Sequence, residues 1–162
     1  MIGLLISLFM ENINVVLYIG AFLIAAICSG KKAGGYPGEL LRWVLFLCGG
    51  VMGVYTFVFH VFFSKIASAS IGWAPSPFEY EVGIANLAMG VTCLMALRAS
   101  YSYKLAAGIA LSVWLGGDAV GHVIQMVSAH DFSSGNAGSW FWTDILIPVT
   151  LTSMLYRTRP SQ

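Results

Sequence analysis

An aspartate and a histidine stand four residues apart in the middle of a long apolar stretch. Asp118 and His122 belong to the segment Trp114–His122 (WLGGDAVGH), inside an apolar run from about residue 105 to residue 129. Residues four apart share one face of an α-helix. In a membrane-spanning helix, an unpaired carboxylate this far from the helix ends costs at least ~2.5 kcal/mol. Asp118 therefore requires a proton, a cation or a metal ion beside it.

His60, Glu81 and Asp144 are expected at the same depth in the membrane as Asp118 and His122. With a rise of about 1.5 Å per residue, each lies near one end of its own predicted helix, and these ends are on the side of the membrane that the basic residues, discussed below, predict to be external. Mixed imidazole and carboxylate donors suit zinc, iron, manganese or copper more than calcium. The sequence therefore predicts a transition-metal site with five candidate ligands: His60, Glu81, Asp118, His122 and Asp144.

Four further residues are expected to surround this site or to contact a substrate. Trp114 and Gln125 share the helix face of Asp118, and Asn86 lies roughly 10 Å into its own helix. Glu79 is either a further ligand or a solvated carboxylate in the first turn of a helix, where negative charge is favourable.

A haem is the alternative cofactor at this level. His60 and His122, on separate helices at similar depth, could supply the two axial ligands of a b-type haem. The carboxylates gathered at the same level favour a metal ion over haem, because a haem occupies an apolar slot.

The composition is that of a membrane protein. The 162 residues are 58% hydrophobic and 9% charged, with a mean hydropathy of +0.81. A soluble domain has roughly 25% charged residues. The net charge of +1 and the lack of a basic patch exclude a nucleic-acid partner. We expect the lipid bilayer to be the main partner of one helical domain, residues 1–162.

The three cysteines, Cys28, Cys48 and Cys93, all lie in apolar runs and form no Cys-x-x-Cys motif. A thiol in such a run usually packs as a small hydrophobic group. No nucleophile elbow, phosphate-binding glycine loop or His-Glu-x-x-His motif is present. The cysteines are therefore interpreted as packing residues.

Five apolar stretches approach the ~20 residues that a membrane span requires. The sequence predicts an all-α bundle of about five transmembrane helices, with loops at 66–77 and 130–138. Residues 1–10 carry no basic n-region, so they are expected at the surface or as an extension of the first helix. The expected spans are 12–29, 40–64, 78–97, 105–128 and 140–156.

The basic residues predict the orientation of the bundle. Five spans place seven of the eight Lys and Arg residues on one side, and Lys65 alone on the other. The positive-inside rule then predicts an external N-terminus and a cytoplasmic C-terminus. The seven are Lys31, Lys32, Arg42, Arg98, Lys104, Arg157 and Arg159.

Glycines recur within the predicted spans, where small residues allow close helix packing. Three groups are expected to form such contacts, within the bundle or with a second copy or another membrane subunit. They are Gly49, Gly50 and Gly53; Gly83 and Gly90; and Gly116, Gly117 and Gly121.

Two stretches carry a resemblance that extends over nearly the whole chain. Residues 71–86 (IGWAPSPFEYEVGIAN) and 116–122 (GGDAVGH) resemble an uncharacterised family of small multi-pass bacterial membrane proteins. This likeness implies a location in the bacterial inner membrane and no particular activity. A weaker resemblance is to DoxX-like proteins, four-helix membrane proteins linked to quinone chemistry. In their pattern a proline-containing loop precedes a helix that opens with Glu and then Gly, as at Glu81 and Gly83.

These observations leave two classes of function open. The first is a membrane metalloprotein, a redox or hydrolytic enzyme in which the metal activates water, oxygen or substrate. The second is a non-enzymatic accessory subunit or a small proton or ion transporter. In that case the same carboxylates and histidines relay protons or hold the helices together.

Overall fold

The computed structural model describes residues 11–31 and 34–160, and this part of the chain is helical with no β-strand. The long elements are α2 (Ile13–Cys28), α3 (Gly35–Val44), α4 (Met52–Phe62), α6 (Phe78–Met95), α7 (Tyr101–Ser128) and α9 (Ser139–Thr158). Short elements are α5 (Ser64–Ile71), α8 (Ser134–Ala137), η1 (Ser29–Lys31), η2 (Leu45–Val51) and η3 (Ala96–Arg98). The all-α fold class is confirmed.

The helices coincide closely with the apolar stretches, and three expectations need correction. The predicted loop 130–138 contains the short helix α8. The second stretch begins at Gly35 and not at residue 40, because Pro37 is tolerated in the first turn of a helix. The predicted loop 66–77 is helical up to Ile71, where Gly72 ends α5 in a left-handed conformation with φ of 89°. Residues 1–10, expected at the surface or in the first helix, lie outside the described residues.

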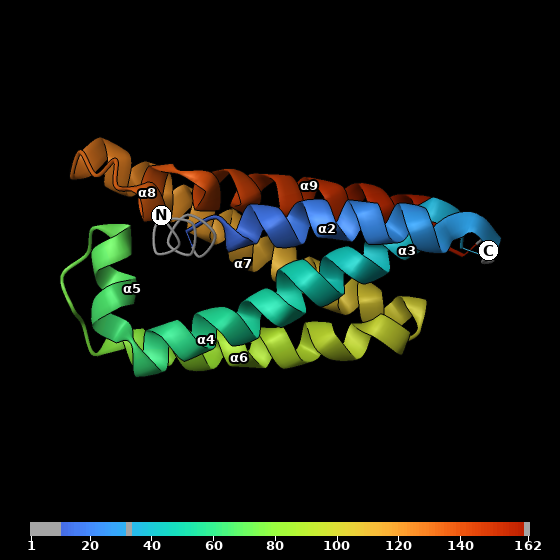
Figure 1. Cartoon of the computed structure of the whole chain (residues 1–162), viewed down its shortest axis with the longest axis horizontal. Helices are drawn as coiled ribbons and strands as arrows, with labels where there is room; N and C mark the ends of the chain where they lie inside the picture. The colour runs from blue at the N-terminus through green and yellow to red at the C-terminus, as the bar shows by residue number, and fades with distance from the viewer. Residues whose placement is uncertain (1–10, 32–33, 161–162) are drawn as a thin grey trace, which may run out of the picture.

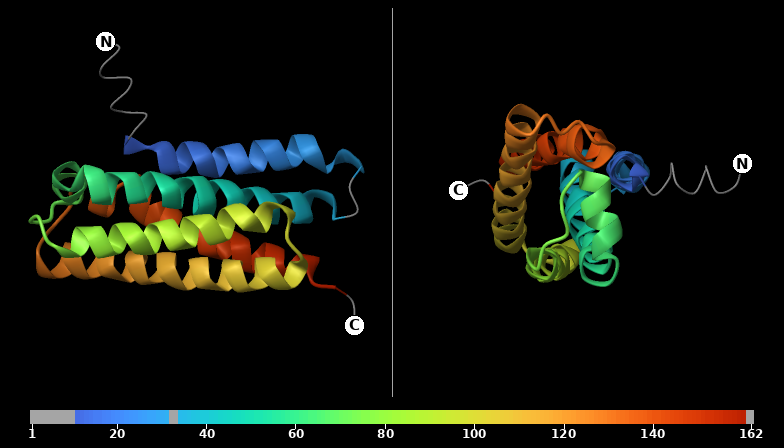
Figure 2. Two further views of the ribbon diagram at one scale, coloured as in Figure 1. Left: turned by 90° about the horizontal axis from the view of Figure 1, so that it is seen from below. Right: turned by 90° about the vertical axis from the view of Figure 1, so that its left-hand side faces the viewer.

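Two helical hairpins form most of the bundle (Figure 1). The first runs from α4 through α5 to α6, and the second runs from α7 through α8 to α9; in each hairpin the two long helices pack together. Helix α2 packs on α3 and α9. The pair α4 and α6 diverges from α2 and α9 toward the end where α5 crosses the bundle, as Figures 1 and 2 show. We call the end that carries α5 and α8 the lid end.

The crossing of α4 and α6 depends on glycine. A Cβ atom on Gly53 would lie 2.7 Å from the Cα atom of Gly90, and one on Gly50 would lie 2.7 Å from the Leu94 side chain. A π-helical segment, η2, joins α3 to α4 directly beside this contact, and such segments change the direction of a helix. The predicted packing role of Gly50, Gly53 and Gly90 is therefore confirmed.

The third glycine group does not pack as predicted. A Cβ atom on Gly116, Gly117 or Gly121 would meet nothing within 4 Å. Among the described residues, the expectation of a close helix contact at these three glycines is therefore wrong. Cys48 and Cys93, in contrast, are buried in the core as predicted.

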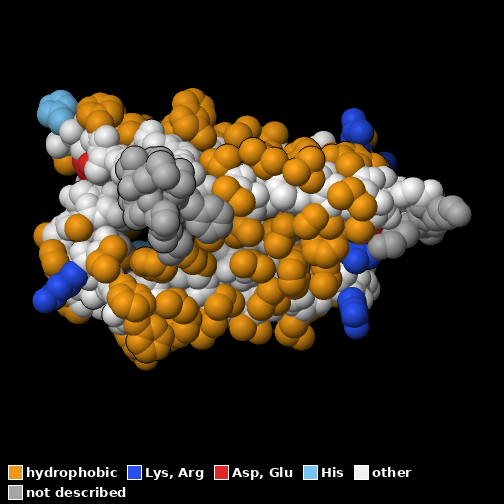
Figure 3. Space-filling model, in the orientation of Figure 1, with side chains coloured by type: hydrophobic (Ala, Val, Ile, Leu, Met, Phe, Trp, Pro, Cys, Tyr) orange, Lys and Arg blue, Asp and Glu red, His pale blue; other side chains and the backbone are white. Residues whose placement is uncertain are grey.

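The surface agrees with a membrane protein. Gly35–Phe62, Phe78–Arg98 and Tyr101–Ser128 are long and apolar enough to cross a membrane, and Ile13–Cys28 is apolar but shorter. Hydrophobic residues such as Ile27 and Val113 are 82% and 71% exposed. Figure 3 shows apolar side chains along the rod, with Lys and Arg toward its two ends.

The described basic residues are unevenly divided between those ends. Lys65 belongs to α5 at the lid end. The others lie at the opposite end, where α2 leads into α3, α6 leads into α7, and α9 ends. We call this the basic end, defined by Lys31, Arg42, Arg98, Lys104, Arg157 and Arg159.

Candidate functional site

A cavity of about 570 Å³ lies between the two hairpins. Its deeper wall is apolar and includes Met52, Met89, Leu111 and Ile147. Toward the lid end the wall becomes polar and includes five of the residues singled out in the sequence, His60, Asn86, Asp118, His122 and Asp144. The volume lies within the 300–1,000 Å³ typical of small-molecule sites.

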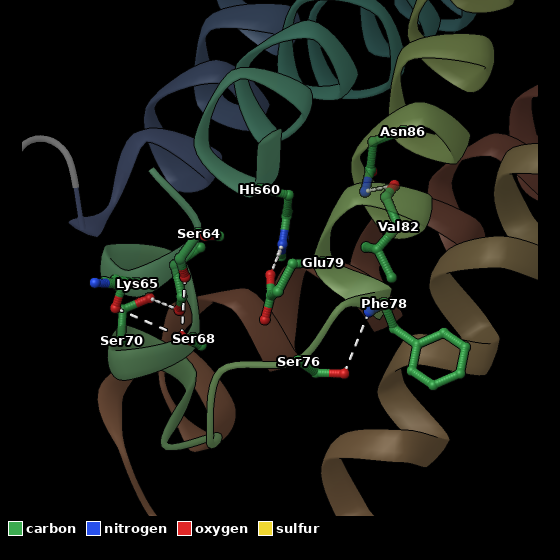
Figure 4. A network of polar contacts seen from close by, with 11 residues as sticks. His60, Ser64, Lys65, Ser68, Ser70, Ser76, Phe78, Glu79, Val82 and Asn86 are labelled. Carbon is green, nitrogen blue, oxygen red and sulfur yellow. Dashed lines mark hydrogen bonds and ion pairs between the residues drawn. The ribbon is translucent and has the colours of Figure 1, made fainter. Parts of the chain in front are cut away.

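The first polar pair at the cavity joins α4 to α6. Nδ1 of His60 lies 2.5 Å from Oε2 of Glu79, and Figure 4 shows the two side chains pointing at one another. Glu79 is only 6% exposed. Because α6 begins at Phe78, Glu79 stands in its first turn, where a carboxylate also interacts favourably with the helix dipole. Glu79 is therefore the partner of His60.

The second pair joins α7 to α9. Nε2 of His122 lies 3.3 Å from Oδ2 of Asp144, and Nδ1 of His122 lies 2.7 Å from Oδ1 of Asn136 in α8. The Asn136 amide nitrogen donates to the Asp131 carbonyl at 2.7 Å, which leaves Oδ1 to accept from the ring. Nδ1 of His122 therefore carries a hydrogen, and a single further proton is shared between Nε2 and Asp144.

The two hairpins place these pairs in the same way. Each has its histidine near the end of the first long helix, His60 in α4 and His122 in α7. Each has its acid near the start of the second helix, Glu79 in α6 and Asp144 in α9. The short elements α5 and α8 connect the two helices across the lid end. The cavity is thus flanked by one imidazole–carboxylate pair from each hairpin.

Asp118 differs from the other acids. It is exposed and lines the cavity beside Gly117 and Gly121. It interacts electrostatically with Asp144 and His122, and it has no hydrogen bond or ion pair with any residue that the structure describes. Because neither glycine contributes a side chain, nothing separates the Asp118 carboxylate from the cavity.

Of the other residues that the sequence predicted for the site, some line the cavity and some lie outside it. Trp114 lines it, and so does Asn86, whose amide donates to the Val82 carbonyl at 2.9 Å. Glu81 is exposed and is not part of the wall, since the adjacent turn directs Glu79 and not Glu81 to His60. Gln125 contributes its backbone carbonyl, which accepts from the Asp131 amide at 3.3 Å.

The lid end is held together by contacts between the connecting segments. Oγ of Ser133 donates to the Ile71 carbonyl at 2.6 Å. Gly72 has a φ of 89°, which favours glycine, and a Cβ atom on it would lie 2.5 Å from Oδ2 of Asp131 and displace that carboxylate. Residues of α5 and α8, including Ser70 and Gly135, form the outer wall of the cavity. Asn136 ties this lid to His122.

The described donors do not assemble a metal centre of the predicted kind. No group of three or more His, Cys, Asp or Glu residues is placed to hold one ion in the described ranges 11–31 and 34–160. His60 is paired with Glu79, and His122 is engaged at both ring nitrogens. The transition metal and the haem both stay predictions from the sequence, and we derive no chemistry from either.

Asn136 is the site residue that the sequence did not suggest. It is fully buried, at 0% exposure, although it lies in a segment rich in Gly, Ser and Asn that is typical of a loop. Only its place fourteen residues after an intramembrane histidine, at the same end of the bundle, could have drawn attention to it. Asn14, which donates to Oγ1 of Thr143 at 2.9 Å and also lines the cavity, links α2 to the same wall.

Comparison with known proteins assigns a family. Residues 11–162 match the family described as "Family of unknown function (DUF6790)". The chain belongs to this family. No curated protein and no solved structure matches the chain. The predicted membership of an uncharacterised family is confirmed, and the family itself contributes no activity.

Proposed function

We propose that this chain is a multi-pass membrane protein that binds a small amphipathic molecule in the cavity between its hairpins. The observation that carries the proposal is the polarity gradient of the 570 Å³ cavity. Its depth is lined by residues such as Met52, Met89 and Ile147, and its lid end by His60, which is paired with Glu79, and by the His122–Asp144 pair. An apolar body with one polar head matches that lining.

The His122–Asp144 pair supplies the site with an exchangeable proton. Because Asn136 holds a hydrogen on Nδ1, the ring can pass or accept a proton only through Nε2, which faces Asp144. A polar head that enters the site can therefore gain or lose a proton at Nε2 or at Oδ2. This supports a carrier or receptor function coupled to protonation.

In this proposal five helices cross the bilayer, including the shorter α2 and the helix α9. The lid end faces outward and the basic end faces the cytoplasm, in accord with the positive-inside rule. The support is the gathering of all described Lys and Arg residues except Lys65 at the basic end. The ligand then binds in the outer half of the membrane, which the resemblance to bacterial membrane proteins implies is the inner membrane.

The test uses a neutral fluorescent probe and the protein in phosphatidylcholine nanodiscs. N-Phenyl-1-naphthylamine brightens in apolar surroundings, so saturable fluorescence above that of empty nanodiscs reports the cavity. Gly121→Phe is the blocking variant, since Gly121 lines the cavity and its Cβ position is open. Gly116→Phe is the matched control, because its Cβ position is equally open but Gly116 is not part of the wall.

We expect wild type and Gly116→Phe to bind the probe with equal affinity and Gly121→Phe to bind it at least about tenfold more weakly, a difference of about 1.4 kcal/mol. Thermal unfolding of the three proteins verifies that each is folded. Equal binding by both variants, or no saturable binding by wild type, would refute the proposal.

A further inference from the structure

The polar end of the cavity carries negative charge that the protein does not neutralise. His60 is paired with Glu79 and His122 with Asp144, so each histidine is matched by its own acid. Asp118 remains, without a hydrogen bond or an ion pair to any described residue. The balance of charge in this wall is therefore negative.

Among the described residues, no Lys or Arg side chain lies at the cavity to restore neutrality. Neither Lys nor Arg occurs among the described residues that line the cavity. Lys65 is at the lid end, but it is exposed and outside the wall. The remaining described basic residues lie at the opposite end of the helices, tens of ångströms away by helix length.

Aromatic rings line the same cavity as Asp118. Five of them belong to the wall of the cavity, from α4, α7, α9 and the segment after α5. The faces of Trp, Tyr and Phe attract ammonium groups, and aromatic cages recognise quaternary ammonium ligands. The five are Tyr55, Phe59, Trp73, Trp114 and Trp140.

We propose that the occupant of the cavity is a cationic amphiphile, an apolar chain or ring system that carries a protonated or quaternary amine. The inference rests on the proposed function and adds the charge of the ligand. The ammonium group lies beside Asp118 among the aromatic rings, and the apolar body extends toward Met52 and Met89. Anionic and zwitterionic amphiphiles are disfavoured, because they bring a negative group into a wall that already carries one in excess.

The experiment compares three competitors with matched apolar chains in phosphatidylcholine nanodiscs. They are decyltrimethylammonium, its neutral carbon isostere with a tert-butyl head, and decyl sulfate. Each displaces N-phenyl-1-naphthylamine, and the ratio of cation to neutral affinity is measured for each protein. In wild type we expect the cation to bind at least about tenfold more tightly than the neutral isostere, and decyl sulfate to bind most weakly.

Three variants locate the preference. Asp118→Asn should reduce the cation-to-neutral ratio to about one, and Asp118→Glu should keep it well above one. Glu81→Gln removes an exposed carboxylate of the same end that does not line the cavity, so it should keep the wild-type ratio. A ratio that falls equally in Glu81→Gln would assign the effect to surface charge and overturn the inference.

The outcomes separate the inference from the proposal on which it rests. If the probe binds and the wild-type ratio is about one, the cavity is a binding site without charge preference, and only the inference fails. If the probe does not bind saturably, the proposed function fails and the inference with it.

Discussion

Oδ1 of Asn136 accepts a hydrogen bond from Nδ1 of His122 across 2.7 Å. The two residues come from different elements, α8 and α7, and their contact joins the lid to the wall of the cavity. It fixes which ring nitrogen faces Asp144. A short connecting segment thereby determines the chemistry of a histidine in a long apolar helix.

Replacing Asn136 with Ala should destabilise the protein. The change leaves two partly buried groups without this partner, Nδ1 of His122 and the Asp131 carbonyl, and a full loss of such a bond at a buried group costs roughly 1–3 kcal/mol. We expect a lower free energy of unfolding in detergent and a changed ¹⁵N tautomer signature for His122. Ser128→Ala is the control, since its hydroxyl donates only to the local Ile124 carbonyl. A tautomer signature identical to wild type would contradict the assigned role of Asn136.

A matched pair of glycine substitutions tests the helix crossing. Gly53→Ala places a methyl group 2.7 Å from backbone atoms of α6, which cannot rotate aside, so we expect a loss of roughly 1–3 kcal/mol in the free energy of unfolding. Gly116→Ala meets open space and gains helix propensity, up to about 1 kcal/mol. Thermal unfolding in one detergent compares both with wild type. A Gly53→Ala protein as stable as Gly116→Ala would show that α4 and α6 do not cross as described.

The sequence alone predicted the helices well and the site in part. Apolar stretches of about 20 residues have few folds available to them, so the ranges of α2, α6, α7 and α9 followed directly from composition. Asp118 and His122 stood out because ionisable groups are costly inside such helices. The estimated depth in the membrane could not decide whether Glu79 or Glu81 faces His60. Both stand in the first turn of α6, and the answer depends on how α6 is rotated about its own axis.

The glycines show a second limit of the sequence. Gly53 and Gly121 look alike in an apolar helix, yet one touches the backbone of α6 and the other faces an open cavity. The difference arises from the divergence of the two hairpins toward the lid end, which is a property of the whole bundle. Asn136 escaped notice for the same reason, since its burial depends on how α5 and α8 meet.

Metal analysis tests the hypothesis that Asp118 and His122 bind a transition metal together. Because the described donors form no group of three or more at one point, we expect substoichiometric metal in purified wild type, equal to that of Asp118→Asn. Elemental analysis per chain gives the result, and thermal unfolding verifies the fold of the variant. One metal ion per wild-type chain, lost in Asp118→Asn, would restore the metal site and contradict this account.

Reporter fusions test the orientation. With the basic end in the cytoplasm, a reporter that works only in the cytoplasm should be active when fused after Gln162. A reporter that works only outside the cytoplasm should be active when inserted between Ser133 and Gly138, at the lid end. Two reporters on the same side of the membrane would contradict the five-span arrangement.

Site-resolved photolabelling tests the central claim most directly. A neutral alkyl chain bearing a diazirine is added to the protein in nanodiscs and illuminated, and labelled residues are mapped by peptide mass spectrometry. We expect labels at cavity residues such as Met52, Met89 and Leu115, lost when excess N-phenyl-1-naphthylamine is present. Labels at outward-facing Leu23 and Val113, which are 60% and 71% exposed, should persist under competition. Labelling confined to the outward-facing residues, or cavity labels that no competitor removes, would contradict a ligand-binding cavity.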